Sequence, residues 1–91
     1  MDIVWDPSKA KTNVARHGVR FSDVEPVFND LRALTIEDAG SFGEQRFVTI
    51  GSDGFGRVLV VAYTYRADDA IRVISARIAS SRERKLYEEG V

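Results

Sequence analysis

Runs rich in β-branched and aromatic residues, separated by short polar or glycine-rich stretches, occupy most of the chain after residue 32. This pattern predicts four β-strands, at residues 33–38, 45–51, 57–66 and 70–79. The sequence SDGFG predicts a turn between the second and third of these strands, and ADD predicts a tight turn between the last two. Strands joined by such short connections run antiparallel, so we expect them to form a meander.

The start of the chain combines a short apolar run with a helix that has signals at both ends. Residues 3–5 (IVW) predict a first strand. After it, Asp6 is a suitable N-cap, Pro7 fits the first helical position, and Gly18 can end the helix. The pattern therefore predicts a helix between residues 6 and 18.

Two further short helices are expected from capping signals. Ser22 and Glu25 have capping-box spacing in the segment 21–30, and Ser80 and Glu83 repeat that spacing before residues 82–90. The predicted order is β-α-α-β-β-β-β-α. We expect one domain over residues 1–91 of the α+β class, with an antiparallel sheet, two N-terminal helices packed on one face and a short C-terminal helix.

Composition narrows the class of protein. The chain has 91 residues, of which 44% are hydrophobic and 30% charged, an ordinary balance for one small globular domain. It contains no cysteine, which excludes disulfides and thiolate metal sites. No stretch approaches the roughly 20 apolar residues that cross a bilayer, and the first residues lack the order of a signal peptide. We therefore expect a cytoplasmic protein with no membrane association.

The basic residues are mainly arginines, although the net charge is only −1. Of the 13 basic side chains, ten are Arg, and Arg has a rigid fork that matches phosphates and carboxylates. Five of these arginines lie in or beside the predicted strands: Arg46, Arg57, Arg66, Arg72 and Arg77.

These five arginines have two possible roles. They can pair with nearby acids such as Glu44, or they can together bind phosphodiester oxygens. If the turn pairs Arg66 with Ala70, the period of two places Arg66 and Arg72 on one face of the sheet and Arg77 on the other.

Several other side chains are candidates for chemistry or RNA contact. His17, at the end of the first helix, can act as a general acid or base, or can simply bind a helix-end carbonyl. Glu44 is the best-placed carboxylate for a base or for orienting Arg46. Lys9 lies on a helix face. The aromatic residues that can stack on bases, or belong to the core, are Phe47, Phe55, Tyr63 and Tyr65.

No cluster of metal-ligating residues, P-loop or nucleophile motif appears in the sequence, so we predict neither a metal nor another cofactor. Phosphodiester cleavage would then depend on side-chain acid–base groups and positive charge. This is feasible for RNA, because its 2′-hydroxyl is a built-in nucleophile.

Short motifs along almost the whole chain resemble those of the BrnT toxins of bacterial type II toxin–antitoxin systems. They are WDPSKAKTN (5–13), RHGVRF (16–21), VFND (27–30), GEQR (43–46), GR (56–57), YTYR (63–66), RVISAR (72–77) and RERKLYEEG (82–90). Each is weak alone, and the match comes from their order and spacing together.

The resemblance implies a RelE-like fold and a ribonuclease that inhibits translation and growth. It also implies a BrnA antitoxin with a ribbon-helix-helix DNA-binding part, which neutralises the toxin in a heterotetramer and alone contacts operator DNA. The residues carried over as catalytic are His17, Glu44, Arg46, Arg66 and Arg77. Those carried over or proposed as RNA-binding are Lys9, Arg57, Tyr65, Arg72 and Tyr87.

In this interpretation Arg66 and Arg77 hold the scissile phosphate, while Glu44 or His17 exchanges protons. A second interpretation stays open, in which the chain is a non-catalytic partner of a DNA-binding antitoxin and acts only as a co-repressor.

Overall fold

The computed structural model describes residues 1–38, 43–67 and 69–90, and every structural statement below refers to these residues. The predicted order of elements is confirmed, with one 3₁₀ turn added. The elements are β1 (Asp2–Val4), α1 (Pro7–His17), η1 (Phe21–Asp23), α2 (Glu25–Phe28), β2 (Leu34–Asp38), β3 (Arg46–Ser52), β4 (Val58–Arg66), β5 (Ala70–Ile78) and α3 (Ser81–Glu89). Asp68, the middle residue of the predicted ADD turn, lies outside the described residues.

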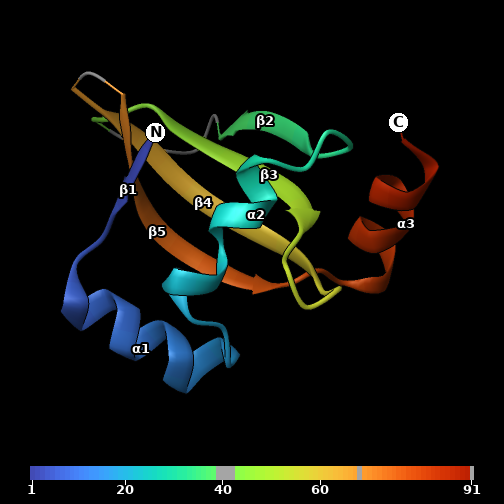
Figure 1. Cartoon of the computed structure of the whole chain (residues 1–91), viewed down its shortest axis with the longest axis horizontal. Coiled ribbons are helices and arrows are strands. Elements are labelled where there is room, and N and C mark those ends of the chain that lie inside the picture. The colour runs from blue at the N-terminus through green and yellow to red at the C-terminus, as the bar shows by residue number, and fades with distance from the viewer. Residues whose placement is uncertain (39–42, 68, 91) are drawn as a thin grey trace.

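The five strands form one sheet in the order β1-β5-β4-β3-β2 (Figure 1). Strands β2 to β5 are the predicted antiparallel meander. The prediction of a wholly antiparallel sheet is wrong, because β1 pairs in parallel with β5 and the sheet is mixed. A three-residue strand carries no pattern that specifies its partner, and this pairing joins segments almost 70 residues apart in the chain.

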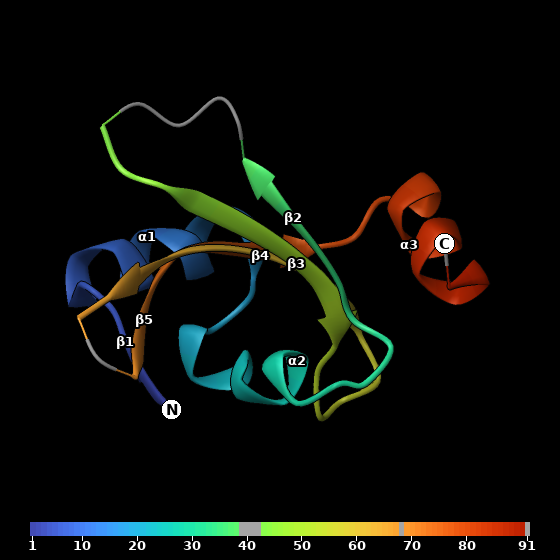
Figure 2. The same cartoon turned by 90° about the horizontal axis from the view of Figure 1, so that it is seen from above.

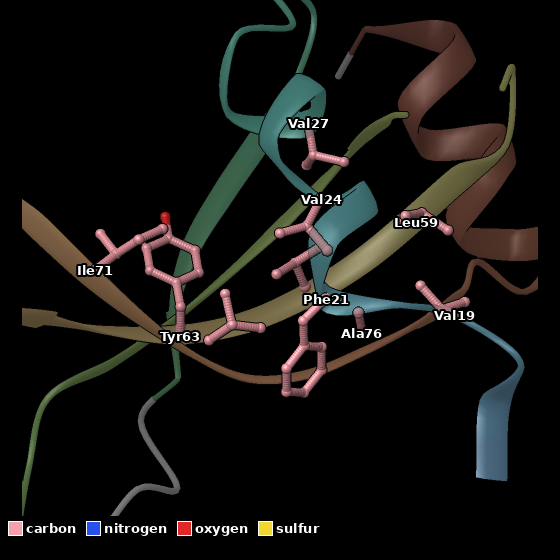
Figure 3. Close-up of a cluster of buried hydrophobic side chains, with 10 residues drawn as sticks. Val19, Phe21, Val24, Val27, Leu59, Tyr63, Ile71 and Ala76 are labelled. Atoms are coloured by element: carbon pink, nitrogen blue, oxygen red, sulfur yellow. The ribbon is translucent and has the colours of Figure 1, made fainter. Parts of the chain in front are cut away.

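The core lies between β4, β5 and the segment that contains η1 and α2 (Figure 3). Phe21, Val24 and Val27 are almost fully buried against residues such as Leu59 and Ile71. Their spacing of three residues suits the tighter 3₁₀ winding, in which i and i+3 side chains eclipse.

The second helix predicted over residues 21–30 is therefore split into η1 and a single turn, α2. Val24 is the residue that precedes α2, and no side chain caps it, so the predicted capping box of Ser22 and Glu25 is wrong. The capping box of Ser80 and Glu83 at α3 is confirmed.

Helix α1 has the predicted signals at both ends but lies at the edge of the sheet. The Asp6 carboxylate accepts a hydrogen bond from the Ser8 amide, and Gly18 ends the helix with φ 69°. Figure 1 shows α1 beyond β5, while α2 lies in front of the sheet. The expectation that both N-terminal helices cover one face is thus only partly met.

The buried side chain of Asn13 holds α1 against β5. Its amide donates to the Ala76 carbonyl at 2.8 Å and to the Val19 carbonyl at 2.9 Å, and it accepts from the Ala76 amide at 3.1 Å. A side-chain amide here replaces the neighbouring strand that β5 lacks beyond β1, which satisfies backbone groups that would otherwise be buried without a partner.

Candidate functional site

One face of the sheet is turned away from η1 and α2, and we call it the outer face. In Figure 2, α2 lies on the opposite side of the sheet. The cross-strand pairs Thr64↔Arg72 and Val60↔Arg77 lie on this face, since β4 residues 60, 62, 64 and 66 alternate with the buried Leu59, Val61 and Tyr63. The outer face therefore carries Arg66, Arg72 and Arg77 together.

This register corrects the predicted facing of Arg77. Thr64 pairs with Arg72 as expected, but an irregularity between Ala62 and Tyr63 then pairs Ala62 with Ser75 and leaves Ile74 without a partner in the ladder. The extra residue is a β-bulge, and it reverses which face the following side chains occupy. Arg77 consequently lies opposite Val60, on the same face as Arg66, rather than opposite Leu59.

Arg46 and Arg72 share one carboxylate at one end of the outer face. The Arg72 guanidinium donates to both Glu44 oxygens at 2.9 and 3.1 Å, and the Arg46 Nε donates to Glu44 Oε1 at 3.4 Å. Thr64, the ladder partner of Arg72, is 5% exposed and donates its hydroxyl to the Gln45 carbonyl. Desolvation acts to raise the pKa of Glu44, but the charges and hydrogen bonds of Arg72 and Arg46 outweigh it and lower the pKa. Glu44 is therefore an ionised carboxylate that orients two arginines.

Arg66 is the exposed last residue of β4, diagonally across the ladder from Arg72. It has no ion-pair partner in the part of the chain that the structure describes. The end of the outer face thus combines three guanidiniums with the carboxylate of Glu44, and Asp38 lies across the ladder from Arg46. Because Arg66 has no ion-pair partner among the described residues, this end is suited to bind a phosphate group.

Two other predicted arginines are held by carboxylates of their own. Arg77 forms a bidentate salt bridge with Glu83, with nitrogen–oxygen distances of 2.7 and 2.8 Å. The hydrogen bonds from Arg77 are the largest cause that lowers the pKa of Glu83 from 4.5 to about 2. Because Glu83 is also the capping-box residue of α3, Arg77 fixes the start of that helix to β5. Arg66 and Arg77 lie at opposite ends of the β4–β5 ladder, so the structure does not bring them together at one phosphate as predicted.

Arg57 lies away from the outer face, beside the β3–β4 turn. Its Nε donates to Asp53 Oδ2 at 2.7 Å and its NH2 to Asp23 Oδ2 at 3.4 Å. Burial acts to raise the pKa of Asp53, but its hydrogen bonds with Arg57 and Phe55 outweigh burial and lower it. Arg57 therefore holds a turn together.

Lys9 and His17 lie together in a shallow hollow of about 220 Å³ between α1 and β5. Its lining also includes Arg16 and Ser75, and Ser75 pairs with the outer-face residue Ala62. The hollow adjoins the outer face, so His17 and Lys9 are on the same side of the molecule as the strand arginines. We call it the α1 hollow.

Arg16 is a residue of this hollow that the sequence interpretation did not single out. The signal was present in the spacing, because Lys9, Thr12 and Arg16 follow each other at i, i+3 and i+7 and so share one helix face. Without knowledge that β5 approaches that face, the pattern is the same as that of a solvated helix surface.

The two predicted tyrosines do not join the outer face. Tyr65 is 60% exposed but lies on the α2 side, where its ring contacts Phe47 edge-on with centroids 5.1 Å apart. Tyr87 is 8% exposed, and its hydroxyl donates to Asp30 Oδ2 at 2.6 Å. Asp30 also accepts the Ser52 amide, so this contact joins α3 to β3 and to the end of α2. The hydrogen bond from the Tyr87 hydroxyl to Asp30 therefore stabilises the packing of α3.

The described residues contain neither a cluster suited to a metal ion nor a membrane-spanning helix. No group of three or more His, Cys, Asp or Glu side chains among residues 1–38, 43–67 and 69–90 is placed to hold a metal ion. Within the same residues, no helix is long and apolar enough to span a membrane.

Comparison with known proteins gives matches over most of the chain. The family model of the ribonuclease toxin BrnT of type II toxin–antitoxin systems matches residues 5–83. The crystal structure of the Brucella abortus ribonuclease toxin BrnT is similar, with a TM-score of 0.72 and 32% sequence identity over 89% of this chain and 99% of that one. No curated protein matches.

Proposed function

The chain belongs to the BrnT family of ribonuclease toxins of type II toxin–antitoxin systems, and from this premise we propose that it is an endoribonuclease that cleaves RNA without a metal ion. Cleavage would inhibit translation and growth until an antitoxin binds the protein. The observation that carries the proposal is that Arg66, beside Arg46 and Arg72 on the outer face, has no ion-pair partner within residues 1–38, 43–67 and 69–90.

These three guanidiniums account for phosphate binding and charge stabilisation. A phosphodiester gains negative charge on its oxygens as the 2′-hydroxyl attacks, and fixed donors aimed at that charge lower the barrier. Glu44 keeps two of the three arginines in place, and its ionised form prevents them from repelling each other. In this role Glu44 orients the arginines and does not exchange the proton.

His17 is the better candidate for proton transfer. The lowered pKa of Glu44 makes it a weak base, whereas His17 carries an imidazole, the side chain used most often in general acid–base catalysis. His17 would take the proton from the 2′-hydroxyl or give one to the leaving 5′-oxygen, with Lys9 and Arg16 holding the neighbouring phosphate in the α1 hollow.

The antitoxin expected for this toxin is a BrnA-like protein with a ribbon-helix-helix DNA-binding part. We propose that the two proteins form a heterotetramer in the cytoplasm, in which only the antitoxin contacts operator DNA. A RelE-like relationship of the fold stays a prediction.

A non-catalytic role as co-repressor is the second candidate. It is favoured by the ion pairs themselves, because four of the five arginines predicted for RNA already hold carboxylates: Arg46, Arg57, Arg72 and Arg77. Arginines engaged in this way serve equally well in a protein-binding module.

Expression of the chain alone in a bacterium separates the two candidates. An endoribonuclease should arrest growth and create new RNA 5′ ends within minutes, and the purified protein should produce the same ends in the presence of EDTA. His17→Asn should reduce both effects while it leaves the thermal midpoint unchanged. Unaltered growth and RNA ends, with antitoxin binding retained, would support the co-repressor instead.

A further inference from the structure

Phe55, at the tip of the β3–β4 turn, is a large aromatic side chain left in solvent. It is 74% exposed, and the Arg57 guanidinium lies 5.5 Å from its ring centroid. An aromatic ring next to a guanidinium offers a flat surface and a positive charge to the same ligand.

The turn that presents this ring is fixed by a buried carboxylate. The Asp53 side chain has no exposed surface and accepts three hydrogen bonds, from the amides of Phe55 and Arg57 and from Arg57 Nε, at 2.7 to 2.9 Å. Gly56 has φ 82°, a conformation that few other residues adopt. The ring and the guanidinium are therefore held in position before any ligand arrives, which reduces the entropy lost on binding.

A hollow of about 430 Å³ opens beside the ring, lined by Gly18, Arg20, Asp23, Phe55 and Arg57. Arg20 has no ion-pair partner among the described residues. We call this hollow the Phe55 hollow. Arg57 is paired with Asp53 and Asp23, so the flat ring and Arg20 are the groups that suit a planar ligand carrying a phosphate.

The Phe55 hollow and the α1 hollow lie on either side of the C-terminal end of α1, where consecutive residues of the chain line first one and then the other. Arg16 and His17 line the α1 hollow, the chain then turns at Gly18, and Gly18 and Arg20 line the Phe55 hollow. A strand bound by Lys9 and Arg16 would therefore meet Arg20 and Phe55 next, around the end of α1.

We propose that the Phe55 hollow is a nucleotide subsite of the RNA site, in which a base of single-stranded RNA stacks on Phe55 and its phosphate contacts Arg20. The proposal rests on the proposed function, since that function makes RNA the ligand. Stacking on an aromatic ring is tolerant of sequence, so the subsite contributes affinity and position rather than base identity.

Binding measurements with a strand that cannot be cleaved test the subsite. The probe is a fluorescein-labelled oligoadenylate of ten nucleotides with 2′-O-methyl riboses, and its partner is an abasic strand of the same length and charge. The wild-type full chain should bind the oligoadenylate more tightly than the abasic strand. Phe55→Ala should weaken oligoadenylate binding roughly tenfold and leave the abasic strand unchanged.

Variants at the same position separate stacking from general contact. Phe55→Tyr should retain the wild-type affinity, and Phe55→Leu should lose it, because leucine is apolar but not flat. Arg20→Gln should weaken both strands. The control is Leu31→Ala, which removes another exposed apolar side chain that does not line the hollow and should change neither affinity.

The outcomes that overturn the subsite differ from those that overturn the enzyme. If Phe55→Ala binds both strands like the wild type, or if it weakens only antitoxin binding, the subsite is wrong even when cleavage is intact. If the wild type stacks oligoadenylate on Phe55 but cuts no RNA, the subsite stands and the enzymatic proposal fails.

Discussion

Arg66 and Arg77 project from the same face of the sheet and from neighbouring strands, but their surroundings differ. At the α3 end, Arg77 binds both oxygens of Glu83, a residue that also caps a helix. At the other end, Arg66 has no carboxylate partner among the described residues, and its neighbours Arg46 and Arg72 share a single glutamate. At the α3 end of the outer face an arginine stabilises the fold through an ion pair. At the other end the Arg66 guanidinium remains available to a ligand.

The difference shows that the number of arginines on a face says little about ligand binding. What decides is whether each guanidinium faces a carboxylate that is itself fixed by backbone hydrogen bonds. Glu83 and Asp53 both accept backbone amides, whereas Glu44 is held by its two arginines.

Among the carboxylates that hold Arg57 and Arg77, Asp53 should be the most destabilising to replace, and the test is Asp53→Ala. It leaves two turn amides and Arg57 without their acceptor, and we expect a loss of about 3 kcal/mol in the free energy of unfolding. Urea denaturation of the variant measures this loss. Asp69→Ala, which removes an 86% exposed partner of the N-terminus, is the control and should cost less than about 0.5 kcal/mol. Equal effects of the two changes would contradict the assignment of Arg57 to structure.

Arg66→Ala should reduce RNA cleavage about 100-fold, the usual effect of removing one donor that stabilises transition-state charge. Its stability should stay within about 0.5 kcal/mol of the wild type, because no described contact is lost. Arg77→Ala should show the reverse, with lower stability and normal cleavage per folded molecule. Initial cleavage rates and denaturation midpoints of both variants check this contrast, and loss of stability in Arg66→Ala would refute it.

Tyr87→Phe should destabilise the protein by about 1.5 kcal/mol. The change removes only the hydroxyl that donates to the Asp30 carboxylate at 2.6 Å, a hydrogen bond to a charged group. Cleavage at saturating RNA should not change, because the hydroxyl is already engaged away from the outer face. A rate loss without a stability loss would support the predicted role of Tyr87 in RNA binding.

Glu83→Gln should have the smallest effect, about 1 kcal/mol at pH 7, and it should depend on pH. The pKa of Glu83 is about 2 in the folded protein against an ordinary 4.5. The pair with Arg77 therefore stabilises the wild type fully above about pH 4.5, and this advantage is lost as the pH falls towards 2. Denaturation curves of both proteins between pH 7 and 2 should converge at the acid end.

Local sequence signals were sufficient for most of the elements. Asp6, Pro7 and Gly18 marked α1, the Ser80–Glu83 box marked α3, and the β-branched runs marked β2 to β5 to within a residue. These signals work because caps and turns depend on residues close in the chain. The segment 21–30 was the exception. There the burial of Phe21, Val24 and Val27 favours a 3₁₀ turn followed by one helical turn, rather than the single helix that the capping residues predicted.

The site was predicted in part. Arg46, Glu44, Arg66 and Arg72 were recognised and lie together. Arg77 was placed on the wrong face, because a single bulged residue reverses all later side chains. The apolar positions do change there, from 71 and 73 to 76 and 78, but a strict period of two does not take account of that change. Arg16 was missed because its significance depends on β5 approaching α1.

Residue types at short separation predict most of the elements, their order and the meander, and motifs in a fixed order predict the family. The parallel pairing of β1 with β5, the shared face of Arg66 and Arg77, and the ion pairs of the arginines become visible only in the folded chain. Those features depend on contacts between distant segments, and a guanidinium's role is set by the charge it meets in space rather than by its neighbours in the chain.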